Sequence, residues 1–160
     1  MNTTVAIDPG ASGGIVIESG RGVVAHAMPA TEGDVVNLLG STVRAAEGVS
    51  IRAVVEQVGG YAGGAGQPGS AMFRFGQNFG FLLGVLAALR VRVELVRPQA
   101  WQKALGLGTS KSHASKTAWK NHLKARAQQL FPNQTVTLKT ADALLLLEYA
   151  RRADCKTSPE

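Results

Sequence analysis

Three acidic residues of this chain lie where an ionised side chain is poorly solvated. Asp8 and Glu56 each end a short apolar run, and Asp142 begins an apolar segment with helical spacing. A carboxylate in such surroundings loses hydration and needs a partner. A divalent cation shared among carboxylates is such a partner, and oxygen ligands favour Mg²⁺ or Mn²⁺ over softer metals. We therefore predict that Asp8, Glu56 and Asp142 bind a divalent metal ion together.

Each of these residues also has an ordinary structural interpretation. Asp8 begins an Asp-Pro-Gly sequence that is typical of an Asx-turn, and Asp142 could be a carboxylate favoured by the helix dipole. Glu56 is harder to explain in this way, because it comes late in a run that reads as a buried strand. Glu148, six residues after Asp142, lies about 240° further around a helix, so we expect it outside the site.

The charge distribution points to a polyanionic partner. The net charge is +6, and none of the 11 acidic residues falls between Leu95 and Ala141. That stretch contains eight cations, Arg97, Lys103, Lys111, Lys116, Lys120, Lys124, Arg126 and Lys139, together with His113 and His122. Such a local field concentrates polyanions, so we expect nucleic acid to bind there. The alternative is a solvated basic face without a partner.

The elements that must position these groups follow from the spacing of apolar residues. We predict strands at residues 4–7, 13–17, 22–27, 51–58 and 92–96, the first three as a meander with tight turns. Helices are predicted at residues 32–46, 71–90, 115–130 and 140–152. Loops separate them at residues 59–69, with six glycines in eleven residues, and at 106–112. This order predicts a mixed sheet with helices packed on its faces.

The predicted helix at residues 71–90 has two features of its own. Ser70 is placed to cap its N-terminus. Gly76, Gly80 and Gly84 recur every four residues and form a flat stripe that another backbone can approach closely. The stripe fits either tight packing on the sheet or a contact between subunits, and the sequence favours neither.

Length and composition indicate one soluble domain. The 160 residues suit a single core, and we expect the domain at residues 1–153 with a polar tail at 154–160. The longest apolar candidate, residues 79–89, is too short and too rich in glycine and alanine to span a bilayer. The N-terminus lacks a signal-peptide pattern, and the single cysteine, Cys155, fits a reducing compartment. We therefore expect a cytoplasmic protein without a membrane partner.

Four motifs, in this order within residues 4–150, resemble those of the RuvC family of Holliday junction resolvases. They are Val5-Ala6-Ile7-Asp8-Pro9-Gly10 with Gly13-Gly14, Val55-Glu56-Gln57-Val58, Ser70-Ala71-Met72 with Phe75-Gly76-Gln77, and Ala141-Asp142-Ala143-Leu144. The segment at residues 97–106 is similar to the shorter RuvC-like proteins of phages and prophages. Asp-x-Gly turns also occur in actin-like ATPases, but that family needs two domains around its nucleotide and this chain is too short.

The resemblance implies an α/β chain with an RNase H-like fold, in which a five-stranded mixed sheet carries helices on both faces. It also implies a homodimer whose two sites nick opposing strands of a four-way DNA junction, by phosphodiester hydrolysis that requires Mg²⁺ or Mn²⁺. Asp8, Glu56 and Asp142 become the metal ligands and catalytic residues. Contacts with DNA are expected from Tyr61, Arg74, Lys103, Lys111, Lys116, Lys120 and Lys139, with Tyr61 in the loop that probes the junction centre.

One position departs from the RuvC pattern. Lys139 stands three residues before Asp142, where the family usually has a further metal ligand. It is either a surface lysine or a cation that pairs with the scissile phosphate. The departure keeps a junction-binding protein without catalysis among the alternatives. A nuclease of the same fold that acts on another branched DNA or on structured RNA is the other.

Overall fold

The computed structural model describes residues 2–57 and 69–157. Its elements are β1 (Thr3–Asp8), β2 (Gly14–Ser19), β3 (Gly22–Ala27), α1 (Glu32–Ala45), β4 (Ile51–Glu56), α2 (Gly69–Ala88), β5 (Arg92–Val96), α3 (Pro98–Ala104), the short 3₁₀ helix η1 (Ser110–Ser112), α4 (Lys116–Leu130) and α5 (Ala141–Thr157). None of the described helices has the length and hydropathy needed to cross a membrane.

The strands form one mixed sheet in the order β3-β2-β1-β4-β5. The first three strands are antiparallel neighbours, as the predicted meander requires. β4 runs parallel to β1, and β5 runs parallel to β4. The expected five-stranded mixed sheet is therefore confirmed, with β1 and β4 at its centre.

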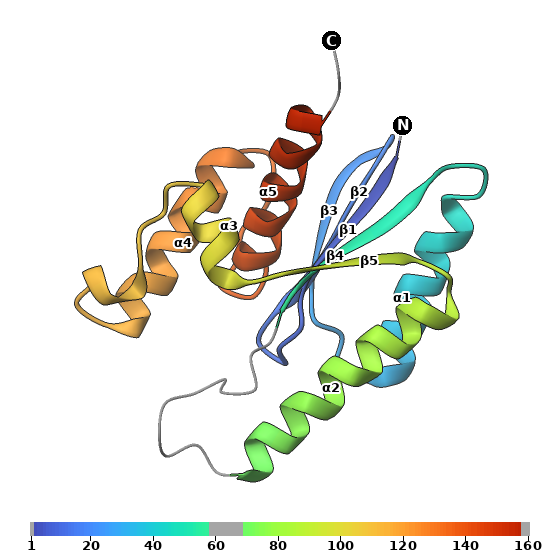
Figure 1. Ribbon diagram of the computed structural model, residues 1–160, viewed down its shortest axis with the longest axis horizontal. Coiled ribbons are helices and arrows are strands. Elements are labelled where there is room, and N and C mark those ends of the chain that lie inside the picture. Colours follow the sequence, from blue (N-terminus) through green and yellow to red (C-terminus); the bar gives the residue numbers. More distant parts are fainter. Residues whose placement is uncertain (1, 58–68, 158–160) are drawn as a thin grey trace.

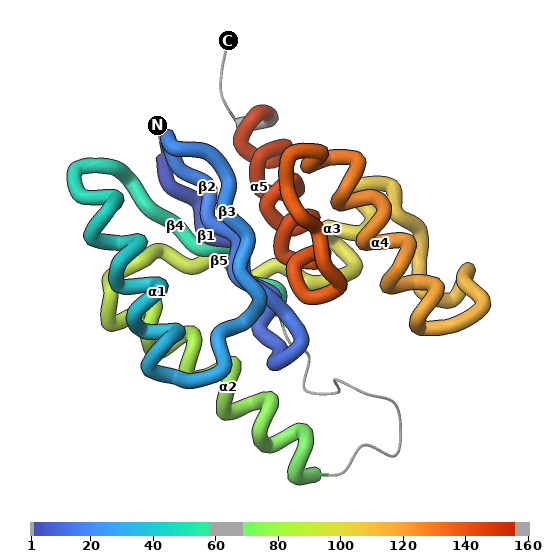
Figure 2. The backbone as a smooth tube through the Cα atoms, turned by 180° about the vertical axis from the view of Figure 1, so that it is seen from behind, coloured from blue at the N-terminus to red at the C-terminus, as the bar shows by residue number. Residues whose placement is uncertain are grey.

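Alternation along the central strands divides the core into two layers. Val5 and Ile7 of β1 pack with apolar residues of α1 and α2, whereas Ala6 between them packs with α3, α4 and α5. Figure 1 shows α1 and α2 on one side of the sheet and the other three helices on the opposite side, and Figure 2 gives the same arrangement from behind. Successive side chains of a strand point to opposite faces, so each central strand contributes side chains to both core layers.

Side-chain caps explain where two of the helices begin. The Thr31 hydroxyl accepts a hydrogen bond from the Asp34 backbone N–H at the start of α1. The Ser115 hydroxyl does the same for the Ala118 N–H at the start of α4. Our prediction that Ser70 caps α2 is wrong, because α2 already includes Gly69 and Ser70 lies inside it.

Two helices differ from the prediction. The short helix α3 was not predicted, because its seven residues offer too few apolar positions to show a helical period. Its proline at the first position is the local signal for a helix start. The last helix runs to Thr157, so residues 154–157, which we expected in a polar tail, are helical. Arg152 donates to Glu148 one turn earlier, and Asp154 accepts from Arg52 of β4, contacts that support this extension.

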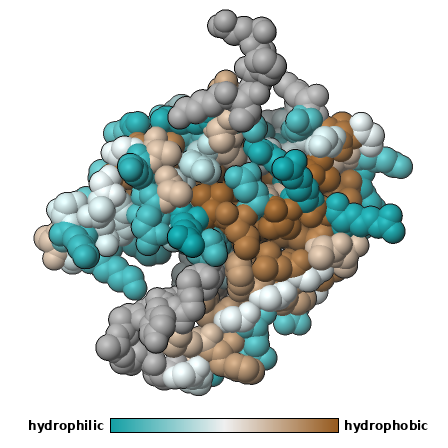
Figure 3. All heavy atoms as spheres, in the orientation of Figure 1, coloured by the Kyte–Doolittle hydropathy of each residue, from teal (hydrophilic) through white to brown (hydrophobic). Residues whose placement is uncertain are grey.

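The glycine stripe of α2 faces open space. Among the described residues, and apart from the neighbouring backbone of the helix itself, a Cβ atom added to Gly76, Gly80 or Gly84 would meet no atom within 4 Å. The interpretation as tight packing on the sheet is therefore wrong, and α2 packs through Leu82 and Leu86 instead. Phe73, also on α2, is 67% exposed, and Figure 3 shows hydrophobic residues gathered on the side of the molecule where α2 and β5 lie. A contact between subunits stays a prediction for this face.

Candidate metal centre

Asp8 and Glu56 lie at the carboxyl ends of the two central strands. Ile7 is the partner of Val55 in the parallel pair β1 and β4, so the next residues, Asp8 and Glu56, end these strands side by side. Asp8 comes two residues after Ala6, whose side chain packs toward α5, so alternation directs the Asp8 side chain to that face. Glu56 likewise comes two residues after Val54, whose side chain lies in the same core layer as that of Ala6. The Glu56 side chain therefore points to the same face of the sheet.

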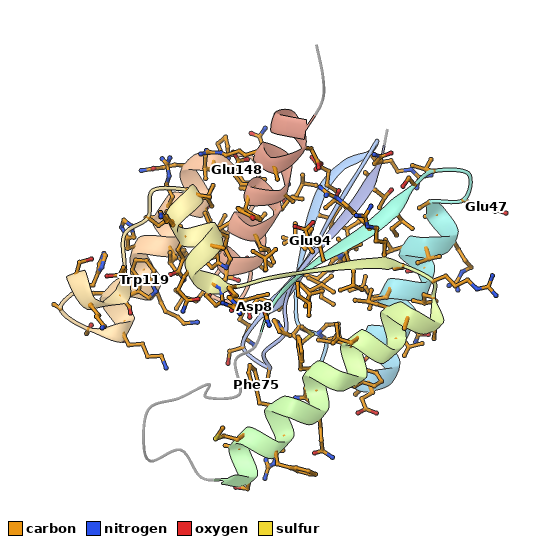
Figure 4. All side chains as sticks on the ribbon, viewed as in Figure 1. Asp8, Glu47, Phe75, Glu94, Trp119 and Glu148 are labelled. Atoms are coloured by element: carbon orange, nitrogen blue, oxygen red, sulfur yellow. The ribbon has the colours of Figure 1, made fainter. Side chains whose placement is uncertain are left out.

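Asp142 approaches these two residues from the helix layer that their side chains face. It lies in the first turn of α5, the helix that packs on β1 and β2. Figure 4 shows Asp8 where the sheet ends meet this helix layer, with Phe75 of α2 below it, and Glu148 toward the other end of α5. Glu148 pairs with Arg151 and Arg152, which agrees with the expectation that it stays outside the site.

Two glycines allow the backbone to close around Asp8. A Cβ atom at Gly13 would lie 2.9 Å from the backbone carbonyl carbon of Asp8. A Cβ atom at Gly14 would lie 2.7 Å from the His26 carbonyl oxygen and 2.8 Å from that of Lys139. Real Cβ atoms do not come so close to backbone atoms, so glycine is required at both positions. The segment before α5 can therefore approach the β1–β2 turn and bring Asp142 beside Asp8.

Burial raises the pKa of each of the three carboxyl groups. The pKa of Asp8 rises to about 6 because of burial and then the charge of Asp142. The pKa of Glu56 rises to about 8 because of burial and then the charge of Asp8. The pKa of Asp142 also rises through burial, with the charge of Lys120 opposing the rise. The three groups are thus poorly hydrated, and the negative charges repel one another.

Two neighbours offset part of this repulsion. The Lys120 Nζ atom of α4 lies 3.9 Å from Asp142 Oδ2, and its charge lowers the pKa of all three carboxyl groups. The indole Nε1–H of Trp101 on α3 donates to Glu56 Oε2 at 2.8 Å. One cation and one neutral donor leave an excess of negative charge when all three groups are ionised. An added cation would remove it.

The donor set fits a hard divalent cation. Carboxylate oxygens from Asp8, Glu56 and Asp142 are the ligands that Mg²⁺ and Mn²⁺ prefer. Within residues 2–57 and 69–157, no group of three His, Cys, Asp or Glu side chains is already arranged to hold a metal ion. To bind one ion together, the three side chains would have to move closer to one another, and the ion would have to displace the protons that the raised pKa values favour.

No protein-family model and no curated protein sequence matches the chain. Solved structures do match it. The structure of RuvC from Thermus thermophilus aligns with a TM-score of 0.52 and 16% identity, over 95% of this chain and 96% of that chain. The chain has the RNase H-like fold of RuvC. RuvC of T. thermophilus in complex with a Holliday junction substrate aligns with a TM-score of 0.57 and 12% identity, over 96% of both chains. The fold class expected from the sequence is thus confirmed over nearly the whole length.

In this RuvC-like fold, the residues expected to contact DNA occupy several elements. Lys103 lies on α3, Lys111 on η1 and Lys116 on α4, and all three side chains are exposed, as is that of Arg74 on α2. Lys120 is half-buried beside Asp142. Tyr61 falls outside the described residues.

Lys139 lies beside the turn after β1. Its side chain is exposed and lines a hollow of about 250 Å³ together with Pro9, Gly10 and Asn78. The three carboxylates do not line this hollow. Lys120, rather than Lys139, is thus the lysine whose charge acts on their pKa values. The role of Lys139 toward a phosphate stays a prediction.

The two histidines of the basic stretch pack against each other. The rings of His113 and His122 lie 4.8 Å apart, and both contact the ring of Trp119. His122 Nε2 lies 3.2 Å from the Leu107 carbonyl oxygen. These contacts hold the segment between α3 and α4, which carries Lys111, against α4.

Trp101 is a residue of this site that the sequence did not indicate. The residue stands in the segment at residues 97–106 that resembles phage proteins, but nothing in that segment indicates a contact with Glu56, 45 positions earlier. The available signal was its type, because a tryptophan that becomes buried needs an acceptor for its N–H.

Proposed function

We propose that this protein is a divalent-metal-dependent endonuclease that resolves four-way DNA junctions as a homodimer. The observation that carries the proposal is the cluster of Asp8, Glu56 and Asp142, three poorly hydrated carboxyl groups with raised pKa values at one end of a RuvC-like sheet. A fold alone does not define an activity, so the proposed activity rests mainly on this cluster of carboxyl groups.

The proposed reaction is hydrolysis of a phosphodiester bond. A bound Mg²⁺ or Mn²⁺ would supply Lewis-acid activation of the phosphate and of water. The three carboxylates would hold the ion, and Lys120, 3.9 Å from Asp142, would pair with the negative charge of the phosphate. A P–O bond to water forms and the bond to the 3′ oxygen breaks, so no protein nucleophile is needed.

The basic stretch offers a surface for the DNA backbone. Lys103, Lys111 and Lys116 are exposed on α3, η1 and α4, elements of the layer that also contains Lys120. Lysines scattered over several elements suit contacts with phosphates, which position a duplex without reading its sequence. We infer that this layer binds the arms of the junction near the carboxylates.

Symmetric incision of a four-way junction requires two sites related by a two-fold axis. The exposed face of α2, with Gly76, Gly80, Gly84 and Phe73, is the candidate contact between subunits. The absence of side chains on the glycines would let two such helices approach closely.

The decisive experiment is incubation of the purified protein with a labelled four-way junction and Mg²⁺ or Mn²⁺, beside a fork and a flap of matched sequence. Paired, symmetric nicks confined to the junction are expected. Asp8→Asn, Glu56→Gln and Asp142→Asn should each abolish cleavage and leave junction binding intact or stronger, because negative charge near the phosphate is removed.

Other results would redirect the assignment. Cleavage of the fork or flap alone would make the protein a nuclease for another branched structure. Tight junction binding without any cleavage would make it a binding protein. A variant of one acid that cuts at the wild-type rate would remove that residue from the site.

A further inference from the structure

We propose that Trp101 is a positioning residue that determines which oxygen atom of Glu56 is offered to the divalent cation. The inference rests on the proposed metal centre and adds a residue to it. The indole Nε1–H of Trp101 donates to Glu56 Oε2 at 2.8 Å. Trp101 is 1% exposed and is one of the largest fully buried side chains.

Glu56 needs such a constraint more than its aspartate neighbours do. Its side chain has one more rotatable bond than that of Asp8 or Asp142, so its carboxylate can reach more positions. A hydrogen bond to Oε2 removes much of that freedom and leaves Oε1 as the oxygen without this donor. Glu56 would then bind the cation through Oε1, because binding through both oxygens would compete with the indole for Oε2.

The backbone holds Trp101 firmly in place. Glu56 pairs with Val96 in the sheet, and the Gln57 N–H donates to the Val96 carbonyl oxygen at 2.8 Å. Pro98 then begins α3 directly after β5, and the first turn of this helix brings Trp101 back over the end of β4. The indole also packs in the core layer that contains the leucines of α5. Its direction is therefore set by the sheet and by α5 together.

The chemistry of indole suits positioning rather than catalysis. Its N–H is a donor only, so it cannot ligate a cation or take up a proton at neutral pH. It is also neutral, so unlike Lys120 it does not repel a cation. Groups that orient the ligands of a metal ion typically change its affinity by about 10- to 100-fold when they are removed.

The test replaces the N–H while keeping the shape of the ring. Incorporation of β-(3-benzothienyl)alanine at position 101 puts a sulfur atom in place of the N–H, and Trp101→Phe is the genetic counterpart. Trp119→Phe is the matched control, because Trp119 is also buried but contacts His113 and His122. 5-Fluorotryptophan at position 101 retains the donor and serves as the rescue.

Two measurements are made on each protein, the Mn²⁺ dissociation constant by calorimetry without DNA and the single-turnover cleavage rate at saturating Mn²⁺. The benzothienyl protein should bind Mn²⁺ about 10- to 100-fold more weakly, while its melting temperature and near-ultraviolet circular dichroism match the wild type. Trp119→Phe and the fluorinated protein should bind Mn²⁺ as the wild type does. The isosteric replacement keeps the test decisive if Trp101→Phe fails to fold.

The possible failures are distinguishable. A benzothienyl protein with wild-type affinity for Mn²⁺ overturns the role of Trp101 and leaves the proposed nuclease intact. If Trp119→Phe weakens Mn²⁺ binding by the same factor, the role of Trp101 is also overturned, because the effect would then come from the helix layer in general. A wild-type protein that binds no Mn²⁺ removes the metal centre and this inference with it.

Discussion

Replacing Lys120 with methionine should change metal binding and cleavage in opposite directions. Methionine retains most of the unbranched apolar stem, so the packing of α4 is preserved while the positive charge is lost. The Lys120 ammonium lies 3.9 Å from Asp142 Oδ2 and repels any cation bound by that carboxylate. Lys120→Met should therefore bind Mg²⁺ or Mn²⁺ more tightly. It should also cut more slowly at saturating metal, because the scissile phosphate loses its cationic partner.

The size of the effect follows from the separation and the exposure of the pair. Two unit charges about 4 Å apart interact by about 1 kcal/mol in water and by about 4 kcal/mol at an effective dielectric constant of about 20. The Lys120 side chain is 38% exposed and that of Asp142 17% exposed, so the lower part of this range applies. For a divalent ion, we expect a gain of about 1–2 kcal/mol, which corresponds to a dissociation constant about 5- to 30-fold lower.

The assay is a calorimetric titration of Mn²⁺ at pH 8.5, where fewer of the carboxyl groups are protonated, paired with single-turnover cleavage at saturating Mn²⁺. Lys116→Met is the matched control, since it makes the same substitution one turn earlier on α4 at an exposed position. Its metal affinity should equal that of the wild type. A Lys120→Met protein that binds Mn²⁺ no more tightly than the wild type would refute the electrostatic reasoning.

Three further predictions concern pH, salt and assembly. Burial and the Asp8 charge raise the pKa of Glu56 from its ordinary value of 4.5 to about 8, so the folded state holds this proton more tightly than the unfolded state. The metal-free protein should therefore lose stability as pH rises from about 4.5 to about 8. Calorimetry should record a falling melting temperature that Glu56→Gln flattens, and a rising one would contradict the burial of this group. Junction affinity should fall steeply as the salt concentration rises. The double variant Lys111→Ala, Lys116→Ala should flatten the slope of log affinity against log salt for all junction sequences alike. A loss of affinity limited to some base sequences would argue for direct reading of the bases. Gly80→Arg should yield a folded monomer, because no described residue outside the adjacent turns of α2 lies within 4 Å of the added Cβ. Light scattering that shows an unchanged dimer would exclude this face of α2 as the interface.

Much of the fold and the identity of the candidate site follow from the sequence. The β-branched runs are local signals that predicted the strands, whereas the one helix cap expected from the sequence, Ser70, lies inside its helix. Asp8 and Glu56 could be selected because each ends an apolar run, and the last residues of adjacent parallel strands meet at one edge. Loss of hydration at such positions is a property of the sequence pattern itself.

Other features were decided only by the tertiary structure. Lys139 is only three residues from Asp142 in the sequence. The lysine that pairs with Asp142 is nevertheless Lys120, which lies 22 positions earlier and on a different helix. The Trp101 hydrogen bond joins α3 to β4, and the stripe of α2 faces outward rather than onto the sheet. These outcomes depend on how helices rotate and cross when they bury their apolar faces. The spacing of residues within one element does not specify which side chain of another element will meet it.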